Sequence, residues 1–321
     1  MTPVKMLCAA LALLLTGAAA PARAEPLKVV ASFSILGDIA REVAGDRAEV
    51  TVLVGPDGDA HSFEPKPSDA SALANADVLI MNGLGFEPWM IRLAAAAKTK
   101  AKYVTASFGA NPRRLEEGGH NHAENHDHDR GEKGHDADGY PKAARDFDPH
   151  VWQNLANGMI YAQNIADGLA EADPEGALVY KANAETYIAE LKKLDLWVKS
   201  EIAKVPAGKR KVITTHDAFG YFGDAYGVEF LAPAGVSNEA EPSAQALARL
   251  IDQIRQEKIK ALFIENMSDP RMMETIARET GAEMGGELYS DALSPPDGPA
   301  PTYMDMFRHN VPVLVGAMQK N

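Results

Sequence analysis

A histidine-rich acidic segment from Glu116 to Asp138 is the part of the sequence best suited to bind metal ions. It holds five of the nine histidines and eight carboxylates, and no aliphatic side chain in it is larger than alanine. Such a composition cannot form a packed core, whereas imidazole is a natural ligand for zinc, copper and nickel. We therefore predict auxiliary, low-affinity metal binding by His120, His122, His126, His128 and His135. The alternative is a solvated acidic loop whose histidines bind nothing.

Three further histidines are candidates for a tighter site, because each lies where α/β proteins usually place their chemistry. His61 lies in the turn-rich stretch 55–65 after a predicted strand, and His216 directly follows another predicted strand. His150 lies where the acidic segment returns to apolar sequence. Loops at strand ends commonly carry the ligands of such proteins. Taken alone, each could equally be a hydrogen-bonded structural histidine, but their shared position favours a joint site.

Strands and helices alternate along the chain in two series, which predicts α/β architecture with parallel sheets covered by helices on both faces. The first series has strands at 27–32, 49–54, 77–81 and 101–105, with helices at 35–43, 68–74 and 88–97. The second has strands at 211–215, 228–231, 261–264 and 283–288, with helices at 243–256 and 270–280. An amphipathic segment interrupted by Pro312 ends the chain, and we expect its histidine, His309, to be structural or exposed.

A long amphipathic helix is predicted between the two series, at 175–204. Asp173 is a suitable N-cap, Pro174 fits the first helical position, and apolar residues from Tyr180 to Val198 recur at three- and four-residue spacing. About thirty helical residues reach roughly 45 Å, long enough to connect two domains as a rigid strut.

The first 24 residues are typical of a signal peptide, with Lys5 before a short apolar run and small residues ahead of Glu25. Cys8, the only cysteine, lies near the start of that run, so we expect neither a lipid anchor nor a disulfide. Removing 1–24 removes two basic residues and no acidic one, which changes the net charge from −13 to −15. We predict a soluble periplasmic protein that binds cations and no nucleic acid.

Several motifs together resemble one family, the metal-specific solute-binding proteins of zinc and manganese ABC importers. The similarity covers nearly the whole mature chain, including Asp148-Pro149-His150-Val151-Trp152, Glu241-Pro242-Ser243 and Tyr289-Ser290-Asp291-Ala292-Leu293. It implies two (β/α)4 lobes joined by a rigid linker helix, with one metal ion between them. The implied ligands are His61 and His150 from the first lobe, and His216 and Asp291 from the second. The corresponding boundaries are 25–172, containing the His-rich loop 113–142, then the linker helix 173–204 and the second lobe 205–321.

Three imidazoles and one carboxylate form a borderline-soft set that suits zinc as the transported ion. Manganese-type relatives typically carry a carboxylate at the third position, which is His216 here. Asp291 could instead cap its own turn, which would leave the fourth position to water. Metal-bound histidines need partners that orient their rings, and the candidates are Asp59, Asp148, Asp217 and Glu241.

These inferences predict capture of Zn²⁺ and its delivery to the membrane permease of a zinc ABC importer. A periplasmic zinc chaperone is a further candidate partner, and we expect the protein to be a monomer and not an enzyme. A secreted zinc hydrolase would compete with this interpretation, but the HExxH and His/Cys/Cys patterns of such enzymes are missing. A manganese-type binding protein and an adhesin of the same fold also compete with it.

Overall fold

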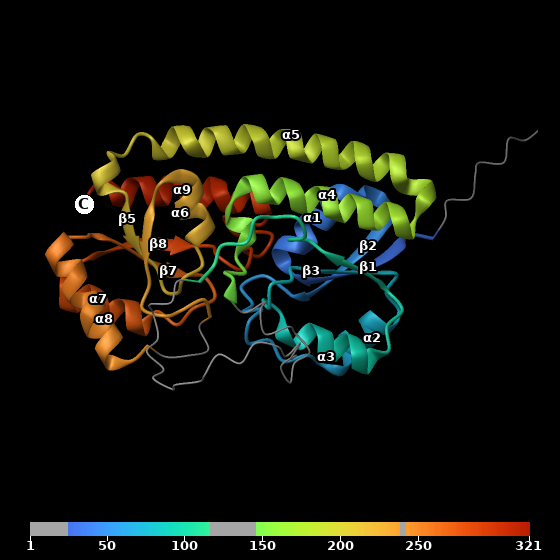
Figure 1. Cartoon of the computed structure of the whole chain (residues 1–321), viewed down its shortest axis with the longest axis horizontal. Coiled ribbons are helices and arrows are strands. Elements are labelled where there is room, and N and C mark those ends of the chain that lie inside the picture. The colour runs from blue at the N-terminus through green and yellow to red at the C-terminus, as the bar shows by residue number, and fades with distance from the viewer. Residues whose placement is uncertain (1–24, 116–145, 238–241) are drawn as a thin grey trace, which may run out of the picture.

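The computed structural model describes residues 25–115, 146–237 and 242–321, which form two parallel sheets of four strands each (Figure 1). The first sheet has the order β2-β1-β3-β4, and the second has the order β6-β5-β7-β8. The first four strands are β1 (Leu27–Phe33), β2 (Ala48–Val54), β3 (Val78–Met81) and β4 (Lys102–Thr105). The second four are β5 (Lys211–Ile213), β6 (Glu229–Leu231), β7 (Ala261–Glu265) and β8 (Glu283–Leu288). The two lobes therefore repeat one topology, as predicted.

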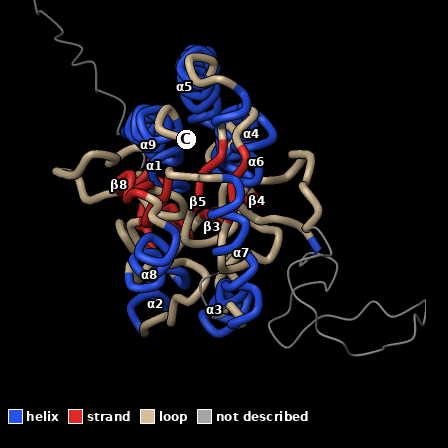
Figure 2. Tube along the Cα trace, turned by 90° about the vertical axis from the view of Figure 1, so that its left-hand side faces the viewer, coloured by secondary structure: helices blue, strands red, loops and turns tan. Residues whose placement is uncertain are grey.

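Helices cover both faces of the strands, as the view along the long axis shows (Figure 2). The central strand β3 is buried at all four positions, which explains its continuous apolar sequence. The helices of the first lobe are α1 (Ser34–Ala44), α2 (Pro67–Ala74), α3 (Pro88–Ala97) and α4 (Leu155–Ala172). Those of the second lobe are α6 (Gly220–Tyr226), α7 (Ala244–Glu257), α8 (Arg271–Thr280) and α9 (Tyr303–Met318).

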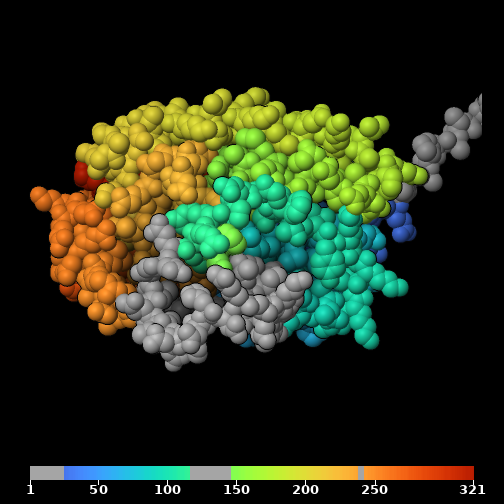
Figure 3. All heavy atoms as spheres, viewed as in Figure 1, coloured from blue at the N-terminus to red at the C-terminus, as the bar shows by residue number. Residues whose placement is uncertain are grey.

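A single long helix, α5 (Ala177–Ile202), runs along one side of both lobes (Figures 1 and 3). It follows a short 3-10 turn, Pro174–Gly176, which is capped by Asp173. Its buried stripe includes Tyr180, Tyr187 and Leu194 and packs against α1 and α4 of one lobe and α6 and α9 of the other. Because one rigid element contacts both lobes, it limits how far they can separate.

The C-terminal helix α9 is continuous, so the expected interruption at Pro312 is wrong. Pro312 lies on the exposed face, as does Arg308 one turn earlier. Proline leaves the carbonyl at 308 without its helical donor, and at this surface water can supply a hydrogen bond instead.

Hydrogen bonds across the lobe boundary join the loops at the facing ends of the two sheets. Trp152 Nε1 and Gln153 Nε2 both donate to the Ser290 carbonyl, at 2.9 and 2.8 Å. The Leu293 amide donates to Ser34 Oγ at 2.9 Å. The Trp152 ring is fully buried, so this junction is part of the core and not a surface contact.

Candidate metal centre

Four side chains converge where the carboxyl ends of strands from both sheets meet. His61 lies in the loop between β2 and α2, and His150 precedes the turn that leads into α4. His216 lies just after β5, and Asp291 lies just after β8. One ligand atom from each residue lies within 4.8 Å of all the others, and all four residues are buried. The residues expected from the family resemblance are thus brought together from both lobes.

The distances within this cluster suit a single ion. His61 Nε2 lies 3.3 Å from His150 Nε2 and 3.4 Å from Asp291 Oδ2, and His216 Nε2 lies 3.1 Å from the same oxygen. An ion bound tetrahedrally by nitrogen at ~2.0–2.1 Å has ligand atoms about 3.3–3.4 Å apart. Asp291 Oδ1 is buried and accepts no hydrogen bond from the described residues. It lies 3.6 Å from His150 Nε2, so a further lone pair faces the cluster.

Asp148 lies where it can orient His150. Its Oδ1 is 2.8 Å from His150 Nδ1 and also accepts the His150 backbone amide at 3.0 Å. With the Nδ1 proton on the side of the carboxylate, the lone pair of Nε2 points into the cluster. The Asp148 carboxylate is fully buried, so the ring has little freedom to turn.

Glu265 plays the corresponding part for His216, and the sequence analysis missed it. Its Oε2 lies 2.5 Å from His216 Nδ1 and accepts from Ser290 Oγ at 2.6 Å. Its Oε1 accepts the backbone amides of Thr215 and His216 at 2.9 and 3.0 Å. Glu265 ends β7, where it is the last residue of a buried strand. An ionisable residue at the end of an apolar run was the signal that could have identified it.

The remaining candidates do not bond to a ligand ring in the described structure. Asp59 accepts the His61 backbone amide at 2.8 Å and Ser62 Oγ at 2.9 Å, so it fixes the turn and not the imidazole. Burial and the nearby Asp148 carboxylate raise the pKa of Asp217. Within the described residues, however, no hydrogen bond joins the Asp217 carboxylate to a ligand residue. His309 lies 3.0 Å from the Glu287 carbonyl, away from the cluster.

Several predicted residues lie outside the described residues. They are Glu241, the signal segment 1–24 with Cys8, and the loop histidines His120, His122, His126, His128 and His135.

Comparison with known proteins identifies the family. The family described as "Zinc-uptake complex component A periplasmic" matches residues 29–317. The chain belongs to this family. Its members are the periplasmic metal-binding components of ABC importers and not enzymes, which agrees with the absence of enzyme activity expected from the sequence.

Similar proteins in this family are named for different metals. The manganese-binding lipoprotein MntA of Halalkalibacterium halodurans is 33% identical over 297 residues, covering 92% of this chain and 90% of MntA. The iron ABC transporter substrate-binding lipoprotein MtsA of Streptococcus pyogenes is 32% identical, covering 93% and 91%. The periplasmic zinc-binding protein TroA of Treponema pallidum has a TM-score of 0.79 at 28% identity, covering 92% and 99%. These names establish a divalent-metal family without selecting one metal.

None of the helices in the described part of the chain has the length and apolar character needed to cross a bilayer.

Neighbouring carboxylates favour protonation of two of the imidazoles in the cluster. Burial lowers the pKa of His150, but Asp291 and Asp148 outweigh it and raise the value to about 9. Burial likewise opposes charge on His216, yet Glu265 and Asp291 raise its pKa well above the usual range. Burial raises the pKa of Asp291, but the two histidines hold it well below its ordinary value. A cation must therefore displace imidazole protons to bind.

Proposed function

We propose that this protein captures Zn²⁺ in the periplasm and delivers it to the permease of an ABC importer. The supporting observation is the convergence of three imidazole nitrogens and one carboxylate from both lobes. We assign His61, His150, His216 and Asp291 as the ligands. A shell of four protein ligands that leaves no position for water would favour carriage over hydrolysis.

Zinc is favoured because three of the four donors are imidazoles and two of these are held by carboxylates. A borderline-soft, nitrogen-rich set suits zinc, whereas manganese prefers more oxygen ligands and higher coordination. The Asp148 and Glu265 carboxylates lie 2.8 and 2.5 Å from Nδ1 of His150 and His216, which supports ring orientations that leave Nε2 for the ion. The His-rich stretch would act as an auxiliary collector, and a periplasmic chaperone could supply zinc to a monomeric binding protein.

Manganese is the second candidate because MntA is named for that metal at 33% identity. Relative affinity in vitro is a poor test, since nitrogen sites generally bind zinc more tightly than manganese. Uptake of radiolabelled zinc and manganese should instead be compared in cells with and without the protein. We expect loss of zinc uptake with manganese uptake unchanged; the reverse result would reject the zinc assignment.

X-ray absorption of the zinc-loaded protein provides the second arm of the test. We expect three nitrogens and one oxygen from the protein. A bound water that remains accessible to added substrates would favour a hydrolase.

A further inference from the structure

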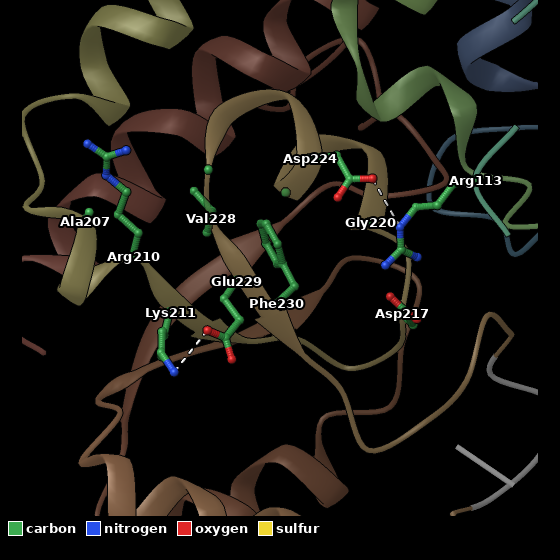
Figure 4. Close-up of a pocket in the computed structure, with 12 residues that line it drawn as sticks. Arg113, Ala207, Arg210, Lys211, Asp217, Gly220, Asp224, Val228, Glu229 and Phe230 are labelled. Carbon is green, nitrogen blue, oxygen red and sulfur yellow. Dashed lines mark ion pairs between the residues drawn. The ribbon is translucent and has the colours of Figure 1, made fainter. Parts of the chain in front are cut away.

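Arg113 lies at the rim between the lobes and contacts acidic residues of both. Its Nη1 is 3.5 Å from Asp148 Oδ2 in the first lobe, and its Nε is 3.3 Å from Asp224 Oδ2 on α6 in the second. Figure 4 shows the ion pair between Arg113 and Asp224, which lies beside Gly220 at one end of a surface hollow. Arg113 therefore links the Asp148 carboxylate to the opposite lobe.

The backbone around Arg113 is fixed by the same two segments. The Arg113 amide donates to the Tyr221 hydroxyl at 2.8 Å, and that hydroxyl donates to the Asp148 carbonyl at 2.9 Å. The Asp148 amide donates in turn to the Arg113 carbonyl at 2.8 Å. Three hydrogen bonds thus join Arg113, Asp148 and α6 before the guanidinium contributes, so the side chain starts from a defined position.

The second lobe leaves space for this contact by placing a glycine opposite it. A Cβ atom on Gly220 would lie 2.6 Å from Arg113 Nη1 and 2.7 Å from Asp148 Oδ2. Both distances are shorter than real Cβ atoms allow, so any side chain at 220 would displace the guanidinium, the carboxylate or both. The glycine, the arginine and the aspartate therefore form one packed unit across the lobe boundary.

The two ionic contacts of Arg113 differ in strength. The Asp224 side chain is 69% exposed, and exposed ion pairs contribute little because water and salt screen them. Asp148 is fully buried, and its Oδ2 has no hydrogen bond within the described residues. A buried carboxylate oxygen in that state depends strongly on the nearest cation. The contact with Asp148 should therefore contribute more interaction energy than the contact with Asp224.

We propose that Arg113 is a positioning residue for the zinc site, acting through Asp148 on the ring of His150. The inference depends on the proposed function, because it assumes that His150 binds zinc. Through its 3.5 Å ionic contact with Oδ2, Arg113 favours the carboxylate orientation in which the opposite oxygen, Oδ1, lies 2.8 Å from His150 Nδ1. Because its guanidinium also spans to α6, the orientation of a first-lobe ligand depends on contact with the second lobe. The protein should therefore hold zinc more tightly when the two lobes are in contact at Arg113.

The test measures the zinc dissociation rate by transfer to an excess of chromophoric chelator, using the full-length protein. Arg113→Gln should accelerate release by about tenfold, at the lower end of what is lost when groups that orient metal ligands are removed. Gly220→Ala should act in the same direction without changing any charge, because its methyl group displaces the same contact. The double variant should be no faster than the faster single variant, because both changes remove one interaction.

Matched controls separate positioning from general destabilisation. Asp224→Asn removes only the exposed contact and should leave release near the wild-type rate. Gly208→Ala introduces a methyl group where nothing lies within 4 Å, and it should also be silent. Arg113→Lys should restore part of the retention. The visible spectrum of the cobalt-substituted protein should change in Arg113→Gln and Gly220→Ala, but not in the controls.

The possible outcomes distinguish two failures. Wild-type release rates and cobalt spectra in both Arg113→Gln and Gly220→Ala would overturn the positioning role while leaving zinc binding intact. Equal acceleration by Asp224→Asn would also overturn it, since the buried contact would then have no special weight. A wild-type protein that binds no zinc would instead reject the proposed function.

Discussion

Replacing Glu265 with glutamine should weaken zinc binding without touching a ligand. The carboxylate faces four donors: two backbone amides, the Ser290 hydroxyl and Nδ1 of His216. A glutamine of the same shape has only one acceptor oxygen. If that oxygen keeps the two amides, its NH₂ group faces His216 Nδ1, which must then become an acceptor. The ring proton moves to Nε2, the atom that should bind zinc.

The expected loss of zinc affinity follows from this change in the tautomer of His216. Removing groups that orient metal-bound histidines typically costs about 10–100-fold in affinity, or about 1.4–2.8 kcal/mol. We expect Glu265→Gln to fall in the upper half of this range. Glu265 is fully buried, so water cannot replace the carboxylate contact with Nδ1 of His216 that glutamine loses.

Glu87 offers a matched control in the other lobe. It is also fully buried, at the start of α3, and it accepts from Ser32 Oγ at 2.7 Å and from the Asn82 amide at 2.5 Å. Burial raises its pKa to about 7, and it bonds to no ligand histidine within the described residues. Competition titration against a zinc chelator should show a loss in Glu265→Gln and none in Glu87→Gln. Wild-type affinity in Glu265→Gln, or equal losses in both variants, would refute the argument.

Two further predictions concern protons and the His-rich stretch. Because the pKa of His150 is raised to about 9 and that of His216 is raised well above its usual range, zinc must displace protons at neutral pH. Affinity should therefore fall as pH falls, by at least about 100-fold between pH 8 and pH 6 for one displaced proton; calorimetry in buffers of different ionisation enthalpy would count the protons, and a flat profile would contradict the protonated site. Deleting residues 118–138 should leave one tight zinc site and remove only weak ones, and His216→Ala should cost far more tight affinity than His122→Ala. Loss of the tight site on deletion, or equal losses in the two variants, would contradict the ligand assignment.

The end of a continuous apolar run marked the position of His216, whereas His150 was placed by the return from acidic to apolar sequence. His216 follows Val212 and Ile213, both fully buried in β5. Glu265, the last residue of strand β7, was missed. It extends the apolar run of β7, and only the fold shows that its carboxylate reaches across to the end of β5. Sequence spacing cannot reveal a contact between residues about 50 positions apart.

Helix α4 shows another limit of sequence reasoning. It contains two glycines and two asparagines, which disfavour helices when judged locally, and no helix was predicted there. The fold gives the reason for both glycines. A Cβ on Gly158 would lie 2.6 Å from the Tyr303 hydroxyl, and one on Gly168 would lie 2.2 Å from Val104 Cγ2. Tertiary packing thus requires glycine at these two positions, although glycine has a low intrinsic helix propensity.

The separation of the four ligands along the chain has a consequence for folding. His61 and His150 are 89 positions apart, and His216 and Asp291 are 75 apart. No short segment can therefore assemble the cluster, and bringing such distant residues together is among the slower events of folding. A partly folded chain offers these four ligands only singly, beside the clustered but weaker-binding histidines of 120–135. Tight zinc capture during refolding should thus appear in the final kinetic phase, after both sheets have formed and docked, so the ion stabilises the finished protein and cannot nucleate it.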